Sequence, residues 1–136
     1  MTMPTNKQII QGAYEAFAKG DVPSVLAVMD DKIEWTEADG FPLHGTYVGP
    51  QAVVDGVFMR LSEIGDDFTV TPTRFVAEDD TVVATGTYSW KHRSTGKPAL
   101  VQMAHVCALS KLVPISTAWG CNQLVGRLGN RRSLSR

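Results

Sequence analysis

The stretch FTVTPTRFVAEDDTVVATGTYSWKHRSTGKPALVQMAHVCAL, residues 68–109, decides the fold of this chain. Three β-rich runs lie within it, at about 68–77, 82–92 and 99–109. Asp79-Asp80 separates the first two runs, and Thr95-Gly96-Lys97 separates the last two. Short polar and glycine-containing links of this kind are typical of hairpin turns between antiparallel strands. The stretch therefore predicts an antiparallel meander of three long strands.

Apolar residues at helical spacing precede the meander. Thr5 and Gln8 have the spacing of a capping box and predict the start of a helix over about 5–19. Asp21 can cap a second helix, in which a proline falls in the tolerated first turn. The two helices are expected to form a hairpin.

A third helix and one short strand complete the first half of the chain. Alternating polar and apolar residues predict a strand over 32–37, and Gly49-Pro50 opens a helix whose apolar stripe continues to Gly65. Helices followed by a meander, without βαβ alternation, indicate an α+β fold with helices covering one side of an antiparallel sheet.

Length and composition fit one cytoplasmic domain. The 136 residues include 43% apolar and 20% charged residues, which is typical of a soluble globular protein. No apolar run could span a bilayer and the start is polar, so neither a membrane contact nor a signal peptide is expected. Cys107 and Cys121 form no metal-ligand pattern, and free thiols without a bound metal are expected.

Charge is unevenly distributed along the chain. All 14 acidic residues lie at or before Asp80, whereas the end of the chain is basic. A basic end can attract nucleic acid, but the acidic body and the lack of interleaved aromatic residues favour a solvated tail and no nucleic-acid partner. We expect a domain over 1–119, with a last strand from Lys111 to Trp119, and a basic, poorly ordered tail over 120–136.

The meander predicts which strand residues share a face. A turn centred near Thr95 pairs Thr87 with Met103, Thr85 with His105 and Val83 with Cys107. The other face then carries Tyr88, Trp90, Leu100, Gln102, Ala104 and Val106. Both faces are too apolar for water, so one should meet the helices and the outer one a second copy of the chain. A homodimer is expected.

Several motifs together resemble a known family. They are Tyr14-Glu15-Ala16-Phe17 followed by Gly20-Asp21, then PLHGTYVGP at 42–50, Thr95-Gly96-Lys97 and Ala104-His105-Val106. In order and spacing, over about residues 5–109, they are similar to SnoaL-like proteins, relatives of ketosteroid isomerase in the nuclear-transport-factor-2-like superfamily. The resemblance implies a cone of three helices on a curved sheet around one internal pocket. Members include isomerases, dehydratases, cyclases, epoxide hydrolases and proteins without a known reaction.

The resemblance implies positions for the chemistry. The late-strand acid of ketosteroid isomerase corresponds to His105, and the base position to Thr36, with Glu37 beside it. Glu37 is either a solvated carboxylate or a base turned inward by a bulge. The family's tyrosine corresponds to Ala13, so Tyr14 is either a core aromatic residue or an acid. His105 is either a proton-transfer group or a satisfied core histidine.

These positions predict a small-molecule site without a cofactor. The expected ligand is a small, mostly apolar molecule bearing a carbonyl or hydroxyl group. Besides His105, Glu37 and Tyr14, the expected substrate-binding residues are Thr36, Trp35, Phe58, Thr85, Thr87, Met103 and Cys107. The epoxide-hydrolase pattern is missing, because no acidic residue follows Asp80. Two functions stay open: cofactor-free isomerase, dehydratase or cyclase chemistry centred on His105, and a non-catalytic ligand-binding or dimerisation module.

Overall fold

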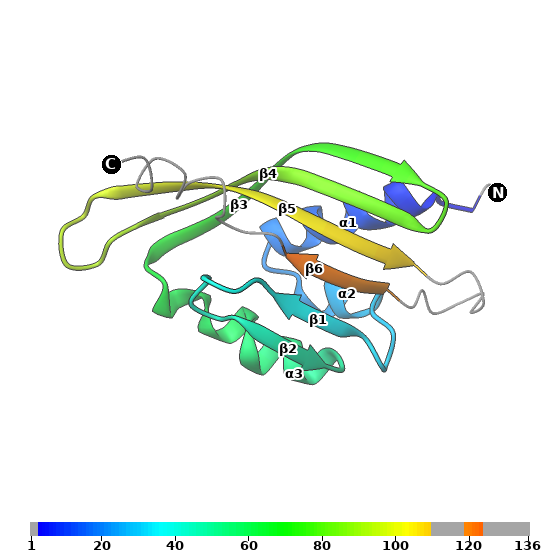
Figure 1. Ribbon diagram of the computed structural model, residues 1–136, viewed down its shortest axis with the longest axis horizontal. Helices are drawn as coiled ribbons and strands as arrows, with labels where there is room; N and C mark the ends of the chain where they lie inside the picture. The colour runs from blue at the N-terminus through cyan, green and yellow to red at the C-terminus, as the bar shows by residue number, and fades with distance from the viewer. Residues whose placement is uncertain (1–2, 110–118, 124–136) are drawn as a thin grey trace.

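The computed structural model describes residues 3–109 and 119–123 of the chain. Its strands are β1 (Glu34–Glu37), β2 (Gly45–Val48), β3 (Asp66–Glu78), β4 (Thr81–Lys91), β5 (Pro98–Leu109) and β6 (Trp119–Gln123). Its helices are α1 (Asn6–Ala18), α2 (Val22–Leu26), α3 (Pro50–Gly56) and the 3₁₀ helix η1 (Phe58–Glu63). The strands form one sheet in the order β2-β1-β6-β5-β4-β3, and the helices cover one side of it (Figure 1). The predicted α+β fold is confirmed.

Side-chain caps begin the first two helices as predicted. The hydroxyl of Thr5 accepts from the backbone N–H of Gln8 at 3.1 Å, and the side chain of Gln8 accepts from the N–H of Thr5 at 2.9 Å. Asp21 accepts from the backbone N–H of Ser24 at the start of α2. These bonds satisfy helix N–H groups that have no partner within the helix.

The third helix is shorter than predicted. A single α-helix to Gly65 was expected, but α3 ends at Gly56, Val57 departs from helical angles, and η1 continues as 3₁₀. The ring of Tyr47 lies against Gly56, where an added Cβ would come within 2.2 Å of it. Tyr47 belongs to β2, a strand that the sequence did not predict because its four residues include a glycine and give too short an alternation.

The three-stranded meander is confirmed, but its expected register is wrong by one residue. β4 and β5 pair Ala84 with His105, whereas Thr85 pairs with Ala104 and Thr87 with Gln102. Because side chains alternate between faces, this single step places Thr85 and Thr87 on the outer face. It also moves Tyr88, which is 2% exposed, to the inner face beside His105.

The expected inward phase of β5 is confirmed. Met103, His105 and Cys107 are all buried, whereas Leu100 on the outer face is 73% exposed. The homodimer through this outer face stays a prediction.

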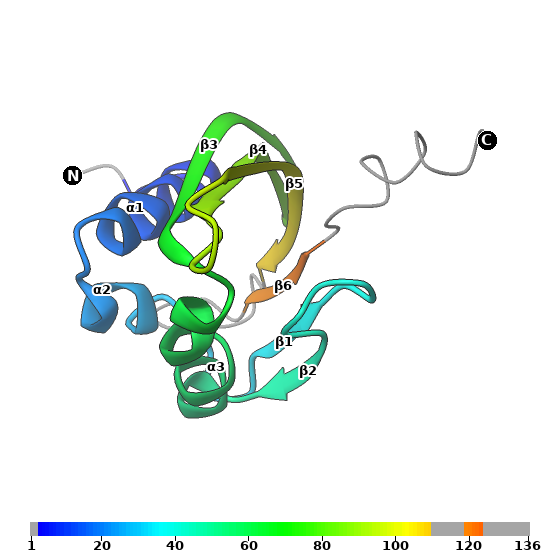
Figure 2. The ribbon, with the colours of Figure 1, turned by 90° about the vertical axis from the view of Figure 1, so that its left-hand side faces the viewer.

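A bulge bends the β3–β4 hairpin around the helices. The pairing of the two strands shifts between Pro72 and Arg74, which inserts one extra residue into β3. Gly86 lies opposite, and a Cβ on it would come within 2.1 Å of the carbonyl oxygen of Thr71. Bulges bend and twist the strand that carries them. Figure 2 shows the resulting sheet, curled with α1 on its concave side.

The described part of the sheet extends past the expected end of the domain. β6 lies between β1 and β5, parallel to β1 and antiparallel to β5, and continues to Gln123. The boundary expected at residue 119 is therefore too early by at least four residues. The strand residues expected at 111–118 and the tail at 124–136 lie outside the described residues. Among the described helices, none is long and apolar enough to cross a bilayer.

Replacing Gly86 by alanine tests the close approach of β3 and β4. The added methyl group meets backbone atoms, so the free energy of unfolding should fall by about 1–3 kcal/mol. Gly12→Ala is the matched control, because nothing lies within 4 Å of the new Cβ and alanine favours a helix by up to about 1 kcal/mol. Urea denaturation of both variants gives the comparison, and an equally stable Gly86→Ala protein would contradict the bend described here.

Candidate functional site

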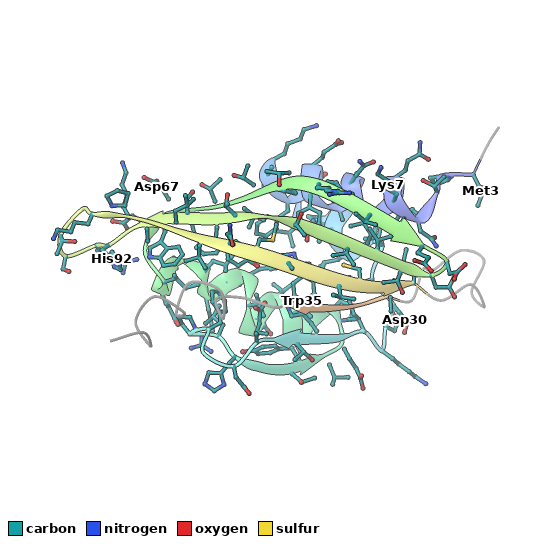
Figure 3. All side chains as sticks on the ribbon, turned by 45° about the horizontal axis from the view of Figure 1, so that its top comes forward. Met3, Lys7, Asp30, Trp35, Asp67 and His92 are labelled. Carbon is teal, nitrogen blue, oxygen red and sulfur yellow. The ribbon has the colours of Figure 1, made fainter. Side chains whose placement is uncertain are left out.

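A cavity lies between the concave face of the sheet and the helices. It encloses about 610 Å³ of space free of atoms, including the part open to solvent. Aromatic rings form much of its wall, from Phe17, Trp35, Phe41, Phe58 and Phe68. Trp35 lies in the middle of the molecule, whereas Asp67 and His92 lie near one end (Figure 3). The cavity has the apolar and aromatic lining that is typical of a small-molecule site.

Two tyrosine hydroxyls contact the two ring nitrogens of His105. The hydroxyl of Tyr14, from α1, is hydrogen bonded to Nδ1, and the hydroxyl of Tyr88, from β4, is hydrogen bonded to Nε2. The ring of Tyr14 also lies parallel to the imidazole, with centroids 5.7 Å apart. The predicted candidates Tyr14 and His105 are thus brought together, and Tyr88 joins them from the face where it was not expected.

Burial fixes the charge state of His105. The side chain is 4% exposed, and desolvation lowers the pKa of its imidazole to about 4. At neutral pH the ring is therefore uncharged, with one nitrogen as donor and the other as acceptor. One tyrosine hydroxyl must then donate to the ring while the other accepts from it. The three side chains therefore form a directed hydrogen-bond chain in which every member is uncharged.

Glu37 is buried, so its interpretation as a solvated carboxylate is wrong. The residue is 2% exposed and lines the same cavity. Desolvation raises the pKa of its carboxyl group to about 7, although a hydrogen bond from Trp35 Nε1 to Oε1, 2.6 Å long, acts in the opposite direction. No bulge is needed to turn it inward, because β1 pairs regularly with β2 and Glu37 shares a face with Trp35.

Glu37 and His105 face the cavity from strands on either side of β6. Thr36 pairs with Asn122 of β6, and one step further along β6, Gln123 pairs with His105. Glu37 and His105 are therefore almost level, with their backbones two strand spacings, or about 10 Å, apart.

The other expected binding residues divide into two groups. Trp35 and Phe58 line the cavity, and their substrate-binding role stays a prediction. Thr36, Thr85, Thr87, Met103 and Cys107 are not among the described lining residues. Thr36 lies on the opposite face of β1, where its hydroxyl is 3.1 Å from that of Thr46.

Sequence reasoning missed Tyr88 and also the lining aromatic residues Phe17, Phe41 and Phe68. The signal for Tyr88 was present in β4, because the small polar residues Thr85, Thr87 and Ser89 alternate with the aromatic residues Tyr88 and Trp90. Among the described residues, no group of three or more His, Cys, Asp or Glu side chains could hold a metal ion.

The comparison with protein families agrees with this architecture. The model of the SnoaL-like domain matches residues 10–111, three quarters of the chain. The chain belongs to the SnoaL-like family. The resemblance predicted from the sequence motifs is thus confirmed.

Solved structures share the fold of this SnoaL-like domain. An NTF2-like protein from Burkholderia thailandensis is 31% identical, with 98% of this chain and 100% of that chain covered and a TM-score of 0.82. TerC, co-crystallised with polyporic acid, is 18% identical over 93% and 95% of the two chains, with a TM-score of 0.76. A protein from Catenulispora acidiphila with a ketosteroid-isomerase-like fold, in complex with trimethylamine, is 12% identical over 88% and 86%, with a TM-score of 0.66. None of the curated proteins matches the chain.

The buried carboxyl group of the SnoaL-like domain predicts a pH-dependent stability difference. Glu37 binds its proton more tightly in the folded state, since its pKa lies near 7 instead of the ordinary 4.5. Its contribution to stability is therefore lost as pH rises from about 4.5 to 7. Glutamine does not titrate, so the free energy of unfolding of Glu37→Gln should not show this decrease. Relative to the wild type, it should rise by roughly 3 kcal/mol between pH 4.5 and 7.

The measurement is urea denaturation at several pH values, with Glu34→Gln as control because Glu34 is on the same strand but exposed. His105 acts with the opposite sign, because its lowered pKa makes stability rise with pH between about 4 and 6.5. Comparing each variant with the wild type separates the two effects. A stability difference for Glu37→Gln that stays constant between pH 4.5 and 7 would contradict the raised pKa.

Proposed function

We propose that the cavity binds a small, uncharged and mostly apolar molecule with a carbonyl group and transfers a proton at a carbon next to that carbonyl. The observation that carries the proposal is the pairing of Glu37, a buried carboxyl group with a pKa of about 7, with the Tyr14–His105–Tyr88 chain across one cavity. A base needs a pKa near the working pH, and a developing oxyanion needs fixed hydrogen-bond donors.

The lining favours a ligand without negative charge. Of the described residues that line the cavity, Glu37 is the one with an acidic side chain, and none is a lysine or arginine. His105 is uncharged at neutral pH because burial lowers the pKa of its imidazole. A buried anion would have no cation to offset its desolvation. Aromatic walls instead favour flat, apolar molecules.

The proposed reaction begins at Glu37. Its ionised carboxyl group takes a proton from the carbon beside the carbonyl, and the electron pair of the broken C–H bond moves to the carbonyl oxygen. A tyrosine hydroxyl of the Tyr14–His105–Tyr88 chain hydrogen bonds to that oxygen and stabilises the enolate. Return of the proton from Glu37 to another carbon completes an isomerisation. Alternatively, a neighbouring hydroxyl group takes the proton from Glu37 and leaves as water as the enolate electrons form the new C=C bond, which completes a dehydration. Attack of the enolate carbon on a second carbonyl, whose oxygen takes the proton from Glu37 and becomes a hydroxyl group, completes a cyclisation.

Structural neighbours support the binding part of the proposal. The fold neighbours TerC and the Catenulispora protein are described with bound organic molecules, polyporic acid and trimethylamine. At 18% and 12% identity these similarities concern the fold, so the ligand of this chain is chosen from its own lining.

A non-catalytic binding module is the second candidate function. The observation in its favour is that two tyrosine hydroxyls engage both ring nitrogens of His105, which is also how a core histidine is satisfied. Such a module would bind the same class of ligand through the aromatic wall. Glu37 separates the two candidates, because a buried carboxyl group destabilises a pocket that has no chemical use for it.

A ligand screen followed by turnover assays tests the function. Thermal shift of the full chain with steroids, aromatic polyketide-like compounds, terpenoids and lactones should identify one binding class, since a ligand at a hundred times its Kd adds about 2.7 kcal/mol to the stability. Carboxylate analogues of the best ligand should bind more weakly than neutral ones.

On that class, Glu37→Gln should lower kcat at least about a hundredfold while ligand binding persists. The rate of the wild type should rise with pH through about 7 as Glu37 ionises. Turnover that survives in Glu37→Gln would overturn the mechanism. Binding without turnover in the wild type would select the binding module.

A further inference from the structure

Trp35 and Glu37 form a hydrogen-bonded pair on one face of β1. They are two residues apart on the strand, so their Cα atoms are separated by about 7 Å and their side chains point the same way. The indole spans this distance, and its Nε1 donates to Oε1 of Glu37 at 2.6 Å. Trp35 is 8% exposed and Glu37 is 2% exposed, so the bond lies out of contact with bulk solvent. Such a bond is stronger than the same pair would form in water.

Packing holds the indole in one orientation. The ring of Phe58 meets it edge to face, with centroids 5.7 Å apart, and Phe58 in turn packs on Phe17 at 5.2 Å. The backbone of Trp35 is paired on both sides, with Tyr47 of β2 and Cys121 of β6. The backbone position is thus fixed, and the indole cannot turn away from Glu37 without displacing the aromatic rings packed against it.

The hydrogen bond between Trp35 and Glu37 has a fixed direction. An indole N–H donates and cannot accept, so it binds a carboxyl oxygen and favours the ionised carboxyl group over the protonated one. This effect opposes desolvation, which is the larger influence and raises the pKa of Glu37 to about 7. Glutamate has three rotatable bonds, and an anchored oxygen limits how its carboxyl group can turn.

We propose that Trp35 is a positioning residue of the site, whose indole N–H anchors one carboxyl oxygen of Glu37 and so fixes the orientation of the carboxyl group toward the cavity. Its catalytic consequence rests on the proposed function, whereas the anchoring itself is measurable without a substrate. The sequence assigned Trp35 to substrate contact; the bond to Glu37 gives it this second role.

Other titratable side chains of the described residues lie near the Trp35–Glu37 pair. Those that face the cavity are Tyr14 of α1, Tyr88 of β4 and His105 of β5. Tyr47, which pairs with Trp35, donates its hydroxyl to the carbonyl oxygen of Leu43 at 2.8 Å. His105 titrates near pH 4, well below Glu37, so the two transitions are separable.

Trp35→Phe tests the proposal, because it keeps an aromatic ring and removes the N–H. Without the bond the ionised carboxyl group loses stabilisation relative to the protonated one. The pKa of Glu37 should therefore rise by about one unit or more above that of the wild type. The measurement is a ¹³C NMR titration of carboxyl-labelled glutamate in the full chain, with the Glu37 signal assigned by its loss in Glu37→Gln. Any activity found should reach a lower plateau at high pH, because the carboxyl group is no longer held in orientation, and its acidic limb should shift to higher pH by the same amount.

Trp90→Phe is the matched control. Trp90 lies on the same face of the sheet, packs on the lining residue Phe68 at 5.9 Å, and its Nε1 has no acceptor among the described residues. This substitution should leave the Glu37 titration unchanged. An upward shift in Trp35→Phe alone supports the proposal, and an unchanged Glu37 titration in a folded Trp35→Phe protein overturns it.

A second measurement leaves Trp35 in place, in case Trp35→Phe does not fold. The ¹H–¹⁵N signal of the Trp35 indole should move with the titration of Glu37 in the wild type and lose that transition in Glu37→Gln. An indole chemical shift that does not change as Glu37 titrates would refute the anchoring. A positive NMR result combined with no turnover on any ligand would retain the anchored pair and reject the catalytic function, so the two failures are distinguishable.

Discussion

The bend of the β3–β4 hairpin is the constraint on which the pocket depends. A bulge between Pro72 and Arg74 bends β3, and Gly86 allows the backbone of Thr71 to approach β4 more closely than any side chain would permit. The bend turns the inner face of β4 and β5 toward α1. Tyr14 can reach His105 only because helix and sheet face each other over this curved surface.

Desolvation then decides the chemistry of the cavity. The same burial that keeps His105 uncharged makes the carboxyl group of Glu37 hold its proton up to about pH 7. The raised pKa of Glu37 and the lowered pKa of His105 both favour the uncharged form of the group. The site can therefore bury both groups at a moderate cost in folding free energy. Neutral partners, the tyrosine hydroxyls and an indole N–H, supply the hydrogen bonds. The site is thus polar in its hydrogen bonds while carrying little charge, which suits an uncharged ligand.

The sequence pattern predicted the site residues unevenly, for physical reasons. Residues 33, 35 and 37 share one face of a strand by simple alternation, so the inward direction of Glu37 was readable. The general preference of carboxylates for solvent argued against it, and burial among aromatic residues overrode that preference. The late-strand position of His105 came from the family resemblance, and the alternation of β5 placed it inward correctly. No pattern in the sequence indicated that Trp35 would donate to Glu37.

By itself the sequence determined the order of the main helices and of the three long strands, because caps, periodicity and turn residues act over a few neighbouring positions, although it missed the short β2. The capping box at Thr5, the meander and the inward phase of β5 were all predictable from such local signals. Only the tertiary structure decided the register between β4 and β5, and with it whether Tyr88 or Thr87 faces His105. A shift of one residue in the pairing of two strands changes the free energy of the turn little, but it exchanges the side chains on the two faces of a strand. Packing of the whole sheet against the helices selects the register that buries the aromatic face.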